Sequence, residues 1–151
     1  MRTITGIEEL QAANGETLGT SEWLEVTQDK INAFADVTGD HQWIHVDVEK
    51  AAQSPFGSTI AHGFYTLTLY PVFNAQIVNF DGFKFALNYG TNKVRFMSPV
   101  PVNSKVRGTA TIKEIKEIEG GAQVTVEMVW EIEGAEKPAC VAEAVARVYG
   151  G

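Results

Sequence analysis

The second half of the chain alternates apolar and polar residues with the two-residue period of half-buried β-strands. The clearest run covers residues 122–132, follows a Gly120-Gly121 turn, and is preceded by a similar run at 105–113. Residues 83–96 and 139–149 complete a set of four candidate strands. The pattern predicts long neighbouring strands that pair antiparallel.

Residues 63–78 have almost no polar face and predict an unusual helix. A helix that is apolar nearly all round must be wrapped by the rest of the protein. Pro71 should kink it or weaken one turn. The last strand would let a sheet approach such a helix closely, because small residues recur on one of its faces: Cys140, Ala142, Ala144 and Ala146. Antiparallel strands curled around one long central apolar helix describe the α+β class and a hot-dog architecture.

The N-terminal third predicts shorter elements. We expect a short helix over residues 7–13 and a strand over 17–26. Thr27 is a good N-cap for a further helix, which Gly39 ends. Asp47 has the same capping role for a short helix that follows it.

The loop expected between Gly39 and Asp47 carries two groups suited to general acid/base chemistry. Asp40 directly follows the glycine, and His45 lies five residues further on. Histidine titrates near neutrality and a carboxylate can orient or assist it, so the two side chains can polarise one water between them. The structural alternative is that Asp40 caps a turn and His45 is a partly buried histidine. Spacing alone favours this alternative.

Length and charge narrow the function classes. The chain has 151 residues, and we expect one domain spanning residues 1–151. Its net charge of −7 argues against nucleic acid as a partner, because binding a phosphate backbone needs a basic surface. The single cysteine, Cys140, cannot form an intramolecular disulfide.

No membrane partner is expected either. The longest apolar stretch, residues 60–78, is interrupted by polar residues and is too short to span a bilayer. The N-terminus lacks the apolar segment of a signal peptide, so we expect a cytoplasmic protein.

Three ordered motifs cover most of the chain. The first runs from Phe34-Ala35-Asp36-Val37-Thr38-Gly39-Asp40 through Ile44-His45-Val46-Asp47, the second is Ile60-Ala61-His62-Gly63, and the third extends over residues 88–100. Together they resemble the MaoC-like dehydratases, the (R)-specific enoyl-CoA hydratase family, and the third resembles its nodulation-protein-N-like branch. Two adjacent positions depart from the family pattern, which usually has Asn-Pro where this chain has Gln42-Trp43.

The resemblance implies the hot-dog fold and a substrate that is a trans-2-enoyl thioester of coenzyme A or of acyl carrier protein. Asp40 and His45 would activate the water and return a proton, and the product would be the (3R)-3-hydroxyacyl thioester. The backbone N–H of Gly63 would hold the thioester oxygen. The sequence supports this last role independently, because free N–H groups at a helix N-terminus can hold an oxygen that carries negative charge.

The remaining expectations concern the pocket. We expect substrate-binding residues among Gln42, Trp43, His62, Tyr65 and Asn88. We expect no cofactor beyond the coenzyme A of the substrate and no metal. A weaker interpretation takes the three histidines of the chain as a metal set, with His41 and His45 spaced as on a helix.

A sheet that covers one helix leaves an edge strand and an open side, so a homodimer is expected.

Two other function classes stay open. One is a non-catalytic acyl-thioester-binding module, and the other is a hot-dog acyl-CoA thioesterase, which would hydrolyse the thioester.

Overall fold

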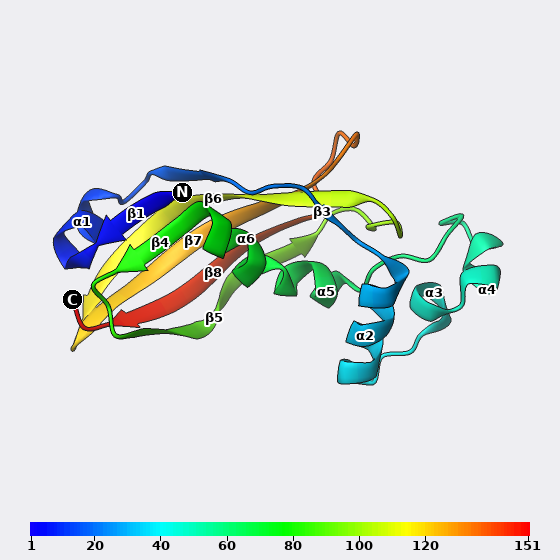
Figure 1. Cartoon of the computed structure of the whole chain (residues 1–151), viewed down its shortest axis with the longest axis horizontal. Helices are drawn as coiled ribbons and strands as arrows, with labels where there is room; N and C mark the ends of the chain where they lie inside the picture. The colour runs from blue at the N-terminus through cyan, green and yellow to red at the C-terminus, as the bar shows by residue number, and fades with distance from the viewer.

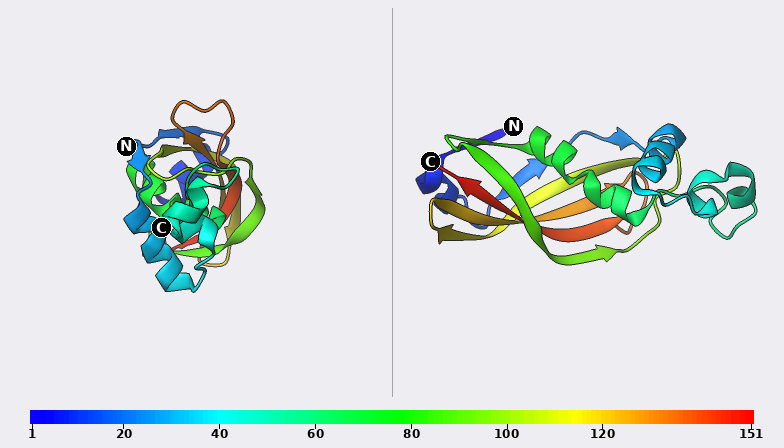
Figure 2. Two further views of the ribbon diagram at one scale, coloured as in Figure 1. Left: turned by 90° about the vertical axis from the view of Figure 1, so that its right-hand side faces the viewer. Right: turned by 90° about the horizontal axis from the view of Figure 1, so that it is seen from below.

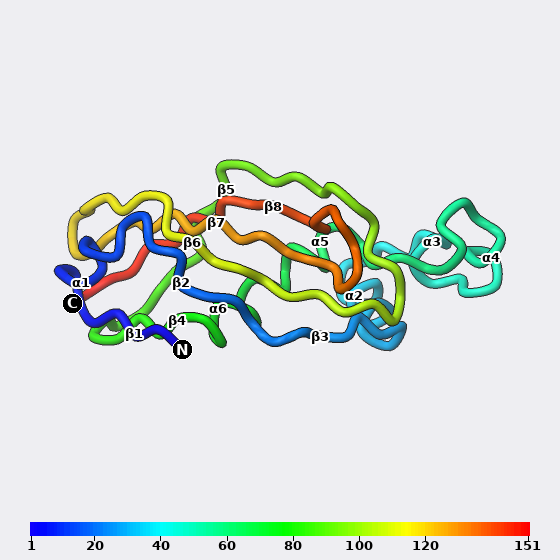
Figure 3. The backbone as a smooth tube through the Cα atoms, turned by 90° about the horizontal axis from the view of Figure 1, so that it is seen from above, coloured from blue at the N-terminus to red at the C-terminus, as the bar shows by residue number.

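The computed structural model describes all 151 residues and is built on one six-stranded antiparallel sheet (Figure 1). The strand order is β2-β6-β7-β8-β5, and the short strand β3 also pairs with β6. Figure 3 shows β5 along one edge of the sheet and β2 with β3 along the opposite edge. The strands are β2 (Thr17–Thr20), β3 (Leu24–Glu25), β5 (Phe85–Phe96), β6 (Lys105–Ile118), β7 (Gly121–Ile132) and β8 (Cys140–Tyr149).

The four long strands pair antiparallel as expected, and β6 and β7 show the predicted alternation of burial, whereas β5 is exposed along nearly its whole length. The buried face of β6 and β7 carries the predicted apolar positions, and Ala110 lies opposite Met128 in the register. Gly108 is a residue of β6 that the helix layer approaches closely. A Cβ at this position would lie 2.5 Å from Met128 Sδ and 2.9 Å from the Phe73 ring. Only glycine lets Phe73 pack against the sheet at this distance.

The sequence predicted one continuous central helix, but the structure has two helices in its place. Helix α5 (Gly63–Thr68) and helix α6 (Tyr70–Ile77) are separated at Leu69, with Pro71 in the first turn of α6. The break precedes the proline because its ring lacks an N–H and would clash with the carbonyl group four residues earlier. The wrapping is also incomplete, since Phe64 is 68% exposed.

The N-terminal residues add a small layer that the sequence did not predict. Strand β1 (Arg2–Thr5) pairs parallel with β4 (Val78–Asp81), which directly follows α6. Helix α1 (Gly6–Ala12) follows β1 in the chain, and its bounds are within one residue of those expected from the sequence. The strand expected over 17–26 is interrupted, so that only its two ends, β2 and β3, pair with β6.

Three helices project beyond the end of the sheet, as Figure 2 shows: α2 (Gln28–Thr38), α3 (Trp43–Val46) and α4 (Val48–Ala52). The predicted caps are confirmed, because Thr27 Oγ1 accepts from the Lys30 N–H and Asp47 Oδ1 accepts from the Lys50 N–H. Gly39 ends α2 with a φ of 80°, a backbone angle that residues other than glycine rarely adopt. None of the helices is long and apolar enough to cross a membrane.

Candidate active site

His45 is held in one orientation by the backbone of a neighbouring segment. The prediction of a loop here was wrong in part, because His45 lies on the short helix α3. The side chain is buried, and its Nδ1 lies 2.7 Å from the carbonyl oxygen of Ile60. A carbonyl oxygen only accepts, so Nδ1 carries the hydrogen and the neutral ring keeps its lone pair on Nε2. The ring therefore offers one free nitrogen for proton transfer.

Asp40 brings a carboxylate close to this ring. One carboxylate oxygen and one ring nitrogen each of His45 and His62 lie within 4.8 Å of one another. Two hydrogen bonds of about 2.8 Å through a single water span a gap of that size. The carboxylate is oriented by the Gln42 N–H, which donates to Asp40 Oδ1 at 3.3 Å.

The surroundings of His45 favour its neutral form. Burial lowers its pKa below the ordinary value of 6.5, and the adjacent His62 lowers this pKa further. The Ile60 carbonyl and the Asp40 carboxylate oppose the shift without cancelling it. A histidine with a lowered pKa is unprotonated at neutral pH, which is the state that a general base requires.

Gly63 lies in the same cavity as His45. This cavity has a volume of about 250 Å³ and also contains Thr66 and Phe96 in its wall. Gly63 is the first residue of α5, and its N–H has no acceptor within the protein. A Cβ on Gly63 would lie 3.1 Å from the Phe96 ring, so the missing side chain leaves room where the aromatic ring borders the cavity.

Gln28 is a supporting residue that the sequence analysis missed. Its Nε2 donates to the carbonyl oxygen of His45 at 2.8 Å, and its Oε1 accepts from the Thr59 hydroxyl. Gln28 thus ties α3 to the segment that carries the Ile60 carbonyl. A glutamine directly after an N-cap resembles any exposed helix residue, so no local signal identifies it.

The predicted pocket residues fall into different places. Gln42 is exposed, and Trp43 is half-buried with Lys50 Nζ 4.6 Å from its ring centroid. Tyr65 is buried in the core, where it meets the Phe34 ring edge-on at 5.6 Å. None of the three residues lines the cavity of His45, and their roles in substrate binding stay predictions.

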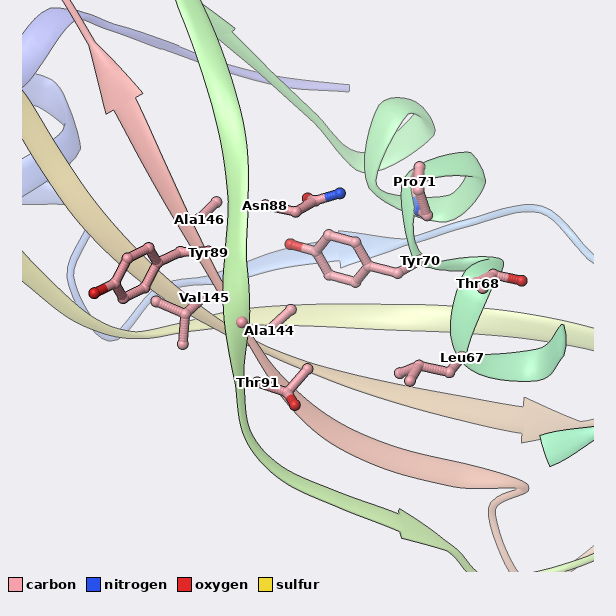
Figure 4. Close-up of a pocket in the computed structure, with 11 residues that line it drawn as sticks. Leu67, Thr68, Tyr70, Pro71, Asn88, Tyr89, Thr91, Ala144, Val145 and Ala146 are labelled. Carbon is pink, nitrogen blue, oxygen red and sulfur yellow. The ribbon is translucent and has the colours of Figure 1, made fainter. Parts of the chain in front are cut away.

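Asn88 lies in a larger cavity, of about 380 Å³, between the α5–α6 layer and strands β5 and β8. Figure 4 shows Tyr70 reaching into this space from the helix side and Asn88 from β5. Ala144 and Ala146 form part of the wall, which explains why these small residues of β8 are only half-buried. The cavity follows the same helix as the one beside Gly63, about one turn further on.

The metal set formed by the three histidines is not brought together. His41 is exposed, and its Nε2 lies 2.9 Å from Asp36 Oδ1. The side chains that lie close together are those of Asp40, His45 and His62. The rings of His45 and His62 are stacked, with centroids 3.8 Å apart and planes 23° from parallel.

Comparison with known proteins agrees with the sequence motifs. The model of the MaoC like domain matches residues 9–132. The chain is 53% identical over 148 residues to 3-hydroxyacyl-thioester dehydratase Z of Mycobacterium tuberculosis, covering 97% of this chain and 98% of the relative. It is 46% identical over 137 residues to nodulation protein N of Rhizobium leguminosarum, covering 85% and 81%.

A solved structure shares the fold. The (R)-hydratase PhaJ1 of Pseudomonas aeruginosa superimposes with a TM-score of 0.70 at 21% identity, covering 91% of this chain and 83% of that one. Since the family model and both relatives match most of its length, the chain belongs to the MaoC-like dehydratases, a hydro-lyase family with the hot-dog fold.

Proposed function

We propose that the protein hydrates trans-2-enoyl-CoA to (3R)-3-hydroxyacyl-CoA and catalyses the reverse dehydration. One observation carries the proposal. The free Nε2 of a neutral, buried His45 lies near the Asp40 carboxylate, and a free backbone N–H at Gly63 shares the cavity of that histidine. Hydration of an enoyl thioester requires a base, a group that orients the water, and a hydrogen-bond donor to the thioester oxygen.

The chemistry assigns a role to each group. Asp40 and His45 hold one water, and His45 Nε2 removes its proton as the oxygen attacks C3. The electron pair of the C2–C3 double bond moves toward the thioester carbonyl, whose oxygen gains negative charge and accepts from the Gly63 N–H. The same acid/base pair then delivers a proton to C2. One water is consumed, and the thioester bond stays intact.

The relatives support this reaction type. Dehydratase Z is named for 3-hydroxyacyl thioesters, which are the product of hydration and the substrate of the reverse reaction. The name leaves open whether the thiol belongs to coenzyme A or to acyl carrier protein. The (3R) configuration is proposed from the resemblance to (R)-hydratases.

The acyl chain would occupy the 380 Å³ cavity that contains Asn88 (Figure 4). Its lining on the helix layer begins at Leu67, next to Thr66 of the His45 cavity, and extends to Pro71, in the direction leading away from Gly63. Its wall is mainly apolar, and Tyr70 and Asn88 add polar groups. Tyr70 is largely buried, which raises the pKa of its hydroxyl to about 12 and keeps it a neutral donor.

A homodimer is part of the proposal, and β5 is the surface that would form it. This strand ends the sheet, so one row of its backbone groups has no neighbouring strand. Phe85, Leu87 and Tyr89 are each more than half exposed along it. Light scattering at micromolar concentration should give twice the mass of the chain, and Leu87→Lys should shift the protein toward monomer. A wild-type monomer would contradict the dimer.

The decisive experiment follows the ultraviolet absorbance of the enoyl thioester after crotonyl-CoA is added. Wild-type protein should remove the absorbance, and Asp40→Asn and His45→Ala should slow the reaction at least a hundredfold. His41→Ala is the matched control, because this exposed histidine lies beside the site but pairs with Asp36. Equal activity in all four proteins would refute the assigned roles.

The two alternatives predict different results. A thioesterase would release free thiol, which a thiol reagent detects, and the 3-hydroxyacyl thioester would not accumulate. A binding module, which the similarity to nodulation protein N keeps open, would bind acyl-CoA without turnover and would be indifferent to Asp40→Asn.

A further inference from the structure

The side chain of His62 is buried and hydrogen-bonds to the protein backbone. It is 3% exposed, and its Nε2 lies 2.9 Å from the backbone carbonyl oxygen of Asp40, 22 residues earlier in the chain. Because the carbonyl only accepts, Nε2 carries the hydrogen and donates it. Nδ1 is buried and has no partner. His62 is absent from the wall of the cavity that contains His45 and Gly63.

The ring of His62 also contacts two other rings. One face stacks on His45 at a centroid distance of 3.8 Å, and Phe34 of α2 contacts the ring at 4.9 Å. The backbone of His62 is the N-cap of α5, so the next residue is Gly63. One side chain therefore touches both members of the acid/base pair and is fixed to the start of the helix that supplies the oxyanion donor.

We propose that His62 is a positioning residue: it holds the Asp40 backbone through Nε2–H and supports the His45 ring by stacking, without touching the substrate. This proposal rests on the proposed hydratase function and replaces the substrate-binding role expected from the sequence. A histidine combines the two contacts in one side chain. Phenylalanine could stack but could not donate, and glutamine could donate but could not stack.

The electrostatic surroundings of His45 agree with this role. The titratable groups that face His45 are Asp40 and His62, and Gln28 approaches from α2 with an uncharged amide. His62 disfavours a positive charge on its neighbour, which lowers the pKa of His45 beyond the effect of burial. Removing the His62 imidazole should therefore raise the pKa of His45.

The test uses two variants that each keep one half of the interaction. His62→Phe preserves an aromatic ring against His45 and removes the donor to Asp40. His62→Gln keeps a donor at a similar distance from the backbone and removes the stack. We expect kcat for crotonyl-CoA to fall about tenfold to a hundredfold in His62→Phe, because small displacements of reacting groups have effects of that size. His62→Gln should recover part of this loss, and KM should stay within about twofold in both.

Two further readouts separate positioning from a merely structural role. The acidic limb of the kcat/KM profile should move to higher pH in both variants, and the NMR titration of the His45 ring should move with it. Circular dichroism and thermal unfolding establish that each variant is folded. If His62→Phe does not fold, His62→Gln carries the test through its pH limb and its His45 titration.

The possible outcomes are distinct. A large rise of KM with unchanged kcat would restore the substrate-binding role and overturn the proposal. An unchanged kcat together with an unchanged His45 titration would overturn it as well. If wild-type protein does not hydrate any 2-enoyl thioester, the proposed function fails. The His45 titration then still decides whether His62 supports that ring, because this measurement needs no substrate.

Discussion

Gly63→Ala is a substitution that should separate catalysis from stability. The backbone of Gly63 does not have a positive φ, so alanine can adopt it without strain. At the start of a helix, alanine is favoured over glycine by up to about 1 kcal/mol. The N–H that we propose as the oxyanion donor is retained. Any loss of activity must therefore come from the added methyl group.

The structure shows where that methyl group would go. The new Cβ would lie 3.1 Å from Phe96, a contact that requires the ring or the start of α5 to move by a few tenths of an ångström. Phe96 is 47% exposed, so its ring can move at little cost in stability. Because the ring forms part of the cavity wall beside His45, its movement changes the space for the thioester. We expect kcat/KM to fall about tenfold to a hundredfold, which corresponds to about 1.4 to 2.7 kcal/mol of transition-state stabilisation.

The assay combines crotonyl-CoA kinetics with thermal unfolding. The unfolding midpoint of Gly63→Ala should stay within about 3 °C of wild type, since 1 kcal/mol shifts a domain of this size by about 2 to 4 °C. Gly90→Ala is the matched control for the unfolding midpoint alone, because a Cβ at Gly90 meets no atom within 4 Å and its φ is not positive, whereas Gly90 lines the proposed acyl cavity. If Gly63→Ala retains full activity, the thioester does not need the space beside the start of α5, and the inferred close approach of the substrate to Gly63 is wrong.

Three other expectations follow from the site and the sheet. The acidic limb of wild-type kcat/KM should lie below pH 6.5, because folding lowers the pKa of His45. For the same reason the unfolded chain binds more protons than the folded protein below that pH, so the free energy of unfolding, measured by urea titration, should fall as the pH falls. A limb above pH 6.5 would exclude His45 as the base. Gln28→Leu should lower stability by about 1 to 3 kcal/mol in urea titrations and should reduce kcat, because it removes partners of the His45 carbonyl and of Thr59; wild-type stability would mean that these bonds contribute little. Gly108→Ala should destabilise by about 1 to 3 kcal/mol through its clash with Phe73, whereas Gly90→Ala should be neutral or slightly stabilising, and equal unfolding midpoints would contradict the close approach of helix and sheet.

The sequence predicted the parts of this protein that depend on neighbouring residues. Helix caps act over two or three residues, and the caps at Thr27 and Asp47 are found where they were expected. Strand alternation depends only on which face is buried, and three of the four long strands were predicted to within two residues of their bounds, whereas β6 extends five residues beyond the expected end. The motifs around Asp40 and His45 also pointed to these two residues as a candidate acid/base pair, and the fold places their side chains within 4.8 Å of each other.

Several features required the tertiary structure because they join residues that no short pattern connects. The orientation of His45 depends on a carbonyl 15 residues away, and the Asp40 backbone is held by His62 from 22 residues away. The parallel pairing of β1 with β4 brings together the chain start and the end of α6, and no local periodicity encodes it. The helix break at Leu69 was foreseen only as a kink at Pro71.

The sequence by itself therefore determined which residues could perform the chemistry and which layers would cover them. Only the tertiary structure decided which nitrogen of His45 is free, what use His62 makes of its donor, and that Gln28 joins the two segments of the site. The physical reason is that residue type and periodicity fix burial and local hydrogen bonding. The partner of a buried polar atom, in contrast, is chosen by the packing of segments that are distant in the chain.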